Sequence, residues 1–122
     1  MSNTFQQDIQ AMYALADTSS SLGALIPSLY ETLRRNEASL RGVSYAYRLH
    51  ANDTGFETAF ALTDGRFEER AAGDAVDVTV FGTETNLLHV FQRKLNPAAG
   101  LLLGKLKFEG SKGALLKLAS FL

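Results

Sequence analysis

The 122-residue chain contains no cysteine, which excludes disulfide bridges, thiolate catalysis and zinc sites built on cysteine. Long apolar runs are also missing, and none approaches the roughly 20 residues that a membrane-spanning helix needs. Residues 1–30 hold no lysine or arginine, so a secretory signal is not expected. A net charge of −1 gives no overall field that would attract nucleic acid. With 46% hydrophobic and 20% charged residues, the composition predicts a single soluble domain, which we expect in the cytoplasm.

Charge is divided unevenly along the chain. Residues 1–92 hold 6 basic and 12 acidic side chains, whereas residues 93–122 hold 6 basic side chains and one acidic, Glu109. Basic residues set among apolar ones favour weak docking on an anionic membrane surface, although ordinary solvated faces can give the same separation. The lysines that we expect in such a docking face are Lys105, Lys107, Lys112 and Lys117.

Few residues could carry catalysis. The two histidines, His50 and His89, have no second histidine or cysteine at the spacing of metal ligands. The run G-L-L-L-G-K-L at 100–106 has the outline of a phosphate-binding loop, but Ala99 replaces the first required glycine and Leu106 replaces the hydroxyl residue. We therefore predict that the protein is not an enzyme and has no catalytic residue, metal or cofactor.

The first forty residues carry the spacing of two helices. Apolar residues recur at helical intervals over 4–17, and the run 18–21 interrupts them. Pro27 suits the first turn of a second helix, and Gly42 would end it. The apolar stripe predicted for this second helix is Leu25, Ile26, Leu29, Leu33 and Leu40.

The hydrophobic period then changes from about four to two, which indicates half-buried strands. Turn residues at 52–55 predict that the first two strands are antiparallel. Asp64-Gly65 is a strong hairpin signal, because both residues tolerate positive φ. The alternating segments predict five strands, at 43–49, 56–62, 66–71, 76–80 and 105–109.

Helices are predicted around the last two strands. Thr83 is expected to cap a helix that Asn96-Pro97 ends, and residues 98–103 to form a short turn or helix. Gly110-Ser111 is expected to cap a last helix at 115–122. Strands flanked by helices predict an α+β domain in which helices cover one face of a single sheet.

The last helices have more apolar surface than one contact with a sheet requires. Leu116 and Phe121 lie outside the main stripe of the final helix, and residues 101–103 cannot all face one side. The surplus has two interpretations: closely packed helices or a dimer contact, or helices that close over a cavity for an apolar ligand. The main stripe of the final helix consists of Leu115, Leu118, Ala119 and Leu122.

Three segments carry a family resemblance: F-E-T-A-F-A-L-T-D-G at 56–65, V-D-V-T-V at 76–80, and N-P-A-A-G-L-L-L-G-K-L-K-F-E-G-S-K-G-A-L-L-K-L at 96–118. In this order they resemble the sterol carrier protein 2 family of lipid-binding domains. The resemblance covers about residues 25–122 and leaves residues 1–24 as an N-terminal helical extension. Arg93-Lys94-Leu95 departs from the glycine and lysine that usually precede the asparagine.

The resemblance implies a five-stranded, mixed and mostly antiparallel sheet, with helices on one face that enclose an apolar tunnel. It implies non-catalytic binding or carrying of a fatty acyl chain, an isoprenoid or quinone-like molecule, or a sterol-like lipid. The alternative is a homodimeric or partner-interaction module, an accessory subunit that presents a lipid substrate to an enzyme. The tunnel lining that the resemblance implies is Val78, Val80, Phe91, Leu101, Leu102, Leu103, Leu106, Phe108, Leu115, Leu118, Ala119 and Leu122.

Overall fold

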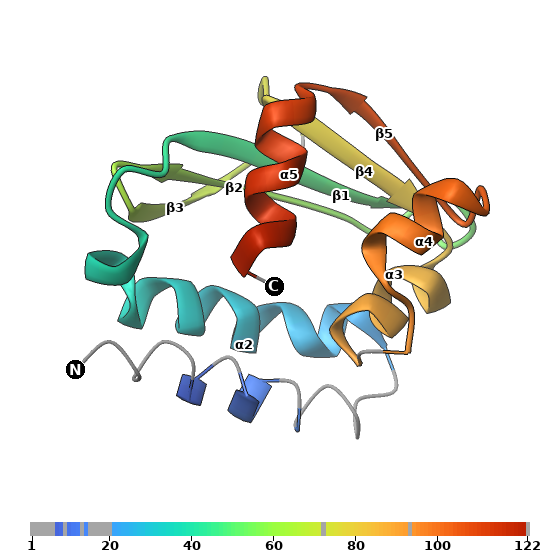
Figure 1. Ribbon diagram of the computed structural model, residues 1–122, viewed down its shortest axis with the longest axis horizontal. Helices are drawn as coiled ribbons and strands as arrows, with labels where there is room; N and C mark the ends of the chain where they lie inside the picture. Colours follow the sequence, from blue (N-terminus) through green and yellow to red (C-terminus); the bar gives the residue numbers. More distant parts are fainter. Residues whose placement is uncertain are drawn as a thin grey trace.

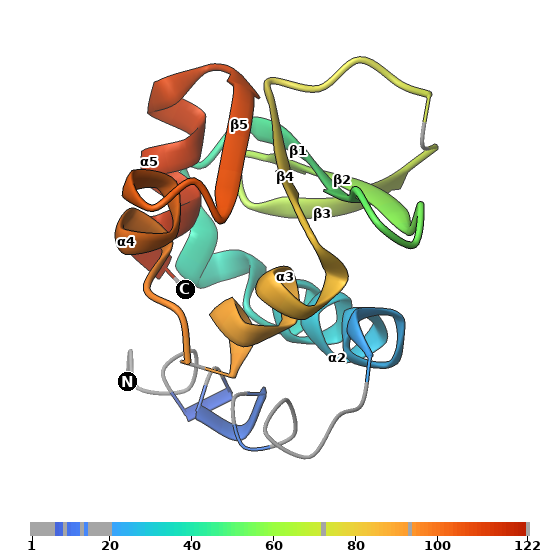
Figure 2. The ribbon, with the colours of Figure 1, turned by 90° about the vertical axis from the view of Figure 1, so that its right-hand side faces the viewer.

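A five-stranded sheet forms one layer of the molecule, and helices cover one of its faces (Figure 1, Figure 2). The computed structural model describes residues 7–8, 10–12, 14, 21–71, 73–92 and 94–121, with side chains as far as residue 118. The strands are β1 (Tyr45–Ala51), β2 (Glu57–Thr63), β3 (Arg66–Arg70), β4 (Val78–Gly82) and β5 (Leu106–Gly110). The helices are α2 (Leu22–Arg35), the 3-10 helix η1 (Glu37–Leu40), α3 (Glu84–Phe91), α4 (Pro97–Leu102) and α5 (Lys112–Phe121).

The sheet has the order β3-β2-β1-β4-β5, in which β1 and β4 are parallel and the other neighbours are antiparallel. Tyr47 is paired with Phe60 on one side and with Val78 on the other, and all three side chains are buried. Since alternate residues of a strand point to opposite faces, this register places the apolar residues of all the strands against the helices. The predicted α+β class and the mixed, mostly antiparallel sheet are confirmed.

The predicted hairpin at Asp64-Gly65 is confirmed by its backbone angles. Asp64 has φ 50° and Gly65 has φ 85°, as a two-residue turn of this type requires. The turn packs against η1 so closely that a Cβ on Gly65 would lie 2.5 Å from the carbonyl oxygen of Glu37. A glycine is therefore required here both for its conformation and for the space it leaves.

The start of α2 differs from the sequence prediction. The helix begins at Leu22, where the Ser21 side chain accepts a hydrogen bond from Ala24 N at 3.2 Å, so Pro27 lies inside the helix and the prediction of a first-turn proline was wrong. An interior proline removes one helical hydrogen bond. Complete burial of Leu22 in the core offsets that loss. Leu40, predicted in the same stripe, belongs to η1.

The other helices begin close to the predicted places. Thr83 caps α3 by accepting from Asn86 N at 3.1 Å, and Ser111 caps α5 by accepting from Ala114 N at 3.1 Å. The last helix therefore starts at Lys112, before the predicted 115. Most of the predicted helix at 4–17 lies outside the described residues, although those described within it are helical. In the described part of the chain, no helix is long and apolar enough to cross a membrane.

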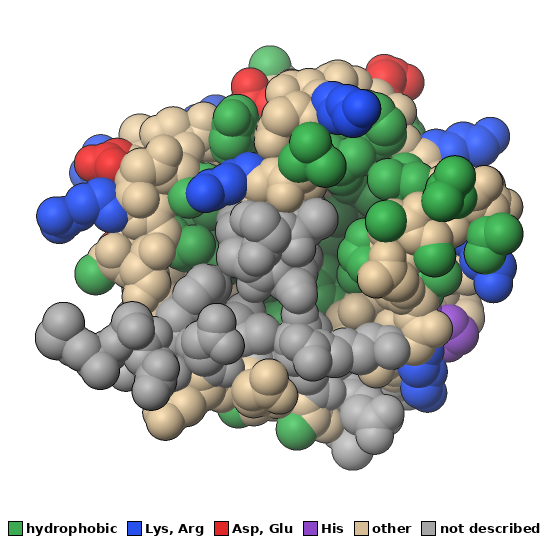
Figure 3. Space-filling model, in the orientation of Figure 1, with side chains coloured by type: hydrophobic (Ala, Val, Ile, Leu, Met, Phe, Trp, Pro, Cys, Tyr) green, Lys and Arg blue, Asp and Glu red, His purple; other side chains and the backbone are tan. Residues whose placement is uncertain are grey.

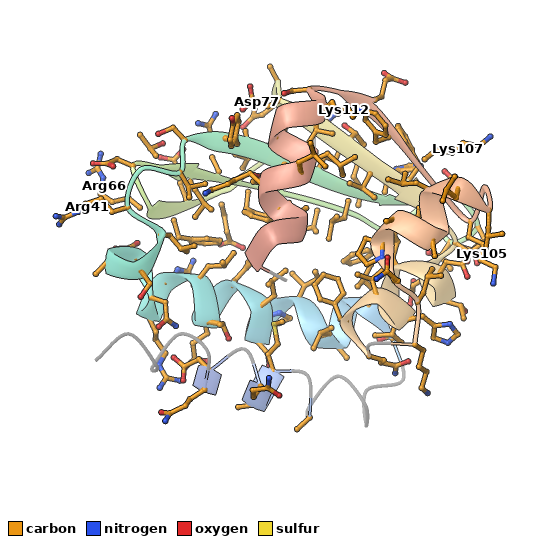
Figure 4. All side chains as sticks on the ribbon, in the orientation of Figure 1. Arg41, Arg66, Asp77, Lys105, Lys107 and Lys112 are labelled. Atoms are coloured by element: carbon orange, nitrogen blue, oxygen red, sulfur yellow. The ribbon has the colours of Figure 1, made fainter. Side chains whose placement is uncertain are left out.

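Asp77 and Gly110 join β1, β4 and the start of α5. The Asp77 carboxylate accepts a hydrogen bond from Ala46 N at 2.6 Å, and its backbone oxygen accepts one from Ser111 N at 2.7 Å. Gly110 has φ 111°, and a Cβ there would overlap that same backbone oxygen. The carboxylate of Asp77 (labelled in Figure 4) therefore holds the backbone of β1 in place beside the start of β4.

Replacing Gly110 with alanine should destabilise the protein, because the new Cβ meets backbone at a positive φ. We expect the free energy of unfolding to fall by about 2 kcal/mol, measured by urea unfolding followed by circular dichroism. Gly73→Ala is the matched control, since no atom lies within 4 Å of a Cβ built there. Equal stability of the two variants would contradict this account of Gly110.

Candidate functional site: an apolar cavity

A cavity of about 60 Å³ lies between the helices and the covered face of the sheet. Every residue that lines it has a hydrophobic side chain, and the sheet and four helices all contribute. The lining residues are Leu29, Leu49, Phe60, Val80, Leu87, Val90, Phe91, Pro97, Leu101, Leu106, Leu115 and Leu118. Figure 3 shows a hollow with hydrophobic walls between α5 and α4, which is where the cavity meets the surface.

The sheet side of the cavity follows from strand register. Leu49 and Val80 are paired neighbours on β1 and β4, and both face the helices. Leu106 of β5 lies between two glycines: a Cβ on Gly100 would come within 2.8 Å of its Cδ1, and a Cβ on Gly82 within 3.0 Å of its Cδ2. Because neither glycine has a side chain, α4 and β4 both approach Leu106 closely, and Leu106 itself lines the cavity.

The helical side of the cavity follows from helical spacing. Leu115 and Leu118 are three residues apart on α5, and Pro97 and Leu101 are four apart on α4. Residues at these separations lie on the same face of a helix. Each helix therefore contributes one face to the cavity.

Helix α3, which contributes three lining residues, is fixed at its first turn by residues of the β1–β2 loop. The Asp53 carboxylate accepts hydrogen bonds from Glu84 N at 2.9 Å and from Thr54 N at 3.0 Å. The Glu84 side chain in turn accepts from the Thr54 hydroxyl at 2.9 Å and from Leu22 N at 3.3 Å. The hydrogen bond from Glu84 N is the main cause that lowers the pKa of Asp53 below its ordinary value, and the backbone N–H groups of Asp53 and Thr54 lower it further.

Two buried tyrosines, Tyr30 and Tyr47, contact the ring of Phe60, which lines the cavity. Burial raises the pKa of both Tyr30 and Tyr47, so both phenols stay protonated and neutral at physiological pH. The Tyr30 hydroxyl bonds to Thr58, whereas the Tyr47 hydroxyl is buried without a hydrogen-bond partner among the described residues. Among those residues, no group of histidine, aspartate and glutamate side chains could hold a metal ion.

The structure brings together on the cavity a part of the lining predicted from the resemblance. Val78 is buried on the same face of β4 but packs in the core outside the cavity. Leu102, Leu103 and Phe108 are 88%, 69% and 38% exposed and do not line it. The Ala119 side chain and Leu122 lie outside the described residues. The predicted residues that do line the cavity are Val80, Phe91, Leu101, Leu106, Leu115 and Leu118.

Sequence reasoning missed half of the lining. The periodicity had already assigned Leu29, Leu49, Phe60 and Leu87 to apolar faces, but period alone does not separate a residue at a cavity from one in the packed core. Pro97 was interpreted only as a helix terminator, and Val90 was not noted. The predicted docking lysines, Lys105, Lys107, Lys112 and Lys117, are all exposed.

Residues 29–122 match the model of the SCP-2 sterol transfer family. The chain belongs to this family. Membership of a family of apolar-lipid carriers agrees with a site built only from hydrocarbon side chains. No protein of curated function matches the chain.

Solved structures show the same fold at low identity. The inverting sec-alkylsulfatase Pisa1 from Pseudomonas sp. aligns with a TM-score of 0.64 and 21% identity over 78% of this chain, which spans only 16% of that protein. Palmitated SCP2L2 from Aedes aegypti aligns with a TM-score of 0.54 and 18% identity, and the alignment covers 74% of this chain and 86% of that one. The ubiquinone synthesis protein UbiJ-SCP2 aligns with a TM-score of 0.52 and 19% identity, and the alignment covers 80% of this chain and 85% of that one.

The acid stability of the protein should depend on Asp53. Because its folded pKa is lower than its unfolded pKa, its stabilising effect is present above the ordinary value and is lost as the pH falls through the folded value. The variant Asp53→Asn keeps an acceptor oxygen but does not titrate. We expect this variant to lose less stability than the wild type between about pH 6 and about pH 3, as measured by urea unfolding. These pH values lie about two units above and one unit below the ordinary pKa of aspartate. Equal losses would show that Asp53 does not contribute.

Proposed function

We propose that the protein binds a single hydrocarbon chain, a fatty acyl or isoprenoid chain, in the cavity and carries it without changing it chemically. The observation that carries the proposal is a cavity lined by hydrophobic side chains alone, which is open between α4 and α5. Each methylene that such a site takes out of water contributes about 0.8 kcal/mol. Hydrocarbon contact can therefore hold one end of a chain in the cavity without any charge pairing.

The size of the cavity supports a slender ligand. An engineered apolar cavity of about 150 Å³ binds benzene, whereas this one measures about 60 Å³. A fused sterol ring system is wider than benzene and would require the helices to separate. One end of a flexible chain fits with side-chain adjustments, and the rest can extend through the opening between α4 and α5.

The groups that could act as acids or bases are committed elsewhere, which supports a carrier rather than an enzyme. His50 Nδ1 lies 2.7 Å from Glu57 Oε1, and both residues project from the face of the sheet opposite the cavity. The Asp77 carboxylate is bound to backbone. The phenols of Tyr30 and Tyr47 are neutral because burial raises their pKa values.

Leu115→Trp should abolish chain binding by filling the cavity from α5. An indole that displaces only two methylenes of the ligand removes about 1.6 kcal/mol, which exceeds a tenfold loss of affinity. The measurement is titration of a fluorescent fatty acid, without vesicles, after delipidation. Leu118→Glu should also prevent binding, because it places a charge in the apolar wall.

The matched control is Leu116→Trp. Leu116 is the next residue of α5, it is 59% exposed, and it does not line the cavity. The control should bind the fatty acid like the wild type, and circular dichroism should show that all variants are folded. If Leu115→Trp binds as well as Leu116→Trp, or if the wild type binds no fatty acid at micromolar concentration, the proposal fails.

A second function is that of an accessory subunit that presents a bound chain to an enzyme. It is favoured by the fold shared with UbiJ-SCP2, a ubiquinone synthesis protein, and with a part of the sec-alkylsulfatase Pisa1. The subunit would then form a stable complex with one enzyme. Sedimentation of native extracts should show the protein in a complex, and the fatty acid titration should give the same affinity in either case.

A further inference from the structure

The end of α4 places two leucines in solvent. Leu102 is 88% exposed and Leu103 is 69% exposed. Helix α4 rests on β5 through Gly100, whose missing side chain makes room for Leu106, and Leu101 faces the cavity. Since successive residues of a helix are turned by about 100°, this seating turns Leu102 away from the protein.

The exposed leucines are held by a rigid helix end. Gly104 has φ 74° and donates its N–H to Leu101 O at 3.3 Å, and Lys105 N donates to Gly100 O at 2.9 Å. These two bonds form the Schellman motif, a regular way of ending a helix. The motif fixes the backbone of Lys105, which follows the two leucines in the sequence, relative to the end of α4.

The segment that carries the leucines is basic. Residues 94–108 contain Lys94, Lys105 and Lys107 and no aspartate or glutamate. Within the described part of the chain, neither Lys105 nor Lys107 forms an ion pair. Figure 4 shows these two lysines at the same end of the molecule as α4, pointing outward, and Arg41 and Arg66 at the opposite end.

We propose that Leu102 and Leu103, flanked by Lys105 and Lys107, form a docking tip for an anionic phospholipid bilayer. Leucines insert among acyl chains, and lysines beside them attract anionic headgroups. The charge pattern favours a bilayer over a second copy of the chain. A symmetric dimer through this tip would bring the lysines of both copies together with no acidic side chain from residues 94–108 between them. The tip is formed by α4, a wall of the cavity opening.

Flotation with phosphatidylglycerol-containing vesicles tests the docking tip. At low salt, each lysine near an anionic surface changes partitioning about fivefold, so Lys105→Gln with Lys107→Gln should reduce binding about 25-fold. Leu102→Ser with Leu103→Ser should reduce it about tenfold or more, because apolar insertion is lost. The charge-matched control is Arg41→Gln with Arg66→Gln, which should leave binding within about twofold of the wild type, because both arginines lie at the opposite end of the molecule from the tip.

Three results would overturn the docking tip. One is equal binding to phosphatidylcholine and phosphatidylglycerol vesicles, and another is an equal loss in the lysine and arginine variants. The third is a dimer in sedimentation that the leucine variant dissociates. Fatty acid titration without vesicles separates this proposal from the proposed function, because the leucine and lysine variants should keep the wild-type affinity. Vesicle binding alone tests the docking tip, whether or not the protein binds a fatty acid.

Discussion

The contact of Leu106 with Gly82 and Gly100 sets the geometry on which the site depends. Two absent side chains allow a strand, β4, and a helix, α4, to approach the same leucine from different directions. The contact fixes the distance of α4 from the edge of the sheet and thereby the width of the opening between α4 and α5. It also fixes the rotation of α4 about its own axis, which decides that Leu101 faces inward and Leu102 outward.

The two faces of the sheet have different chemistry. The covered face is apolar around the cavity, and the phenols of Tyr30 and Tyr47 stay uncharged. An acidic side chain on that face, Glu69, belongs to the edge strand β3 and pairs with Arg34 of α2 at 3.5 Å. On the other face, Glu57 lies 2.7 Å from His50 and 3.7 Å from Arg48. This division keeps ionised groups away from the cavity, as a site that recognises its ligand by hydrocarbon contact requires.

The sequence predicted the sheet well because its signals are local. Alternation along each strand and the Asp64-Gly65 turn identify strands and their faces without reference to the rest of the chain. The start of α2 was wrong because it depends on a distant contact, the burial of Leu22, which outweighs the local signal of Pro27. The cavity lining was predicted only in part because it, too, depends on contacts between residues that are distant in the sequence. Three consecutive leucines at 101–103 cannot all face inward, yet only the seating of α4 on Leu106 decides which one does.

The cavity wall takes residues from the strands, from α2 and α3 below them in Figure 2, and from α4 and α5 around the opening. An occupant would therefore touch elements that otherwise meet only through the core, and it would act as an additional core residue. Anything that binds only the folded state raises its stability by mass action, by about 2.7 kcal/mol at a free concentration a hundred times Kd. A hydrocarbon chain bound as proposed would therefore raise the melting temperature of the protein as its free concentration rises, and the protein without it would be the form more exposed to proteolysis.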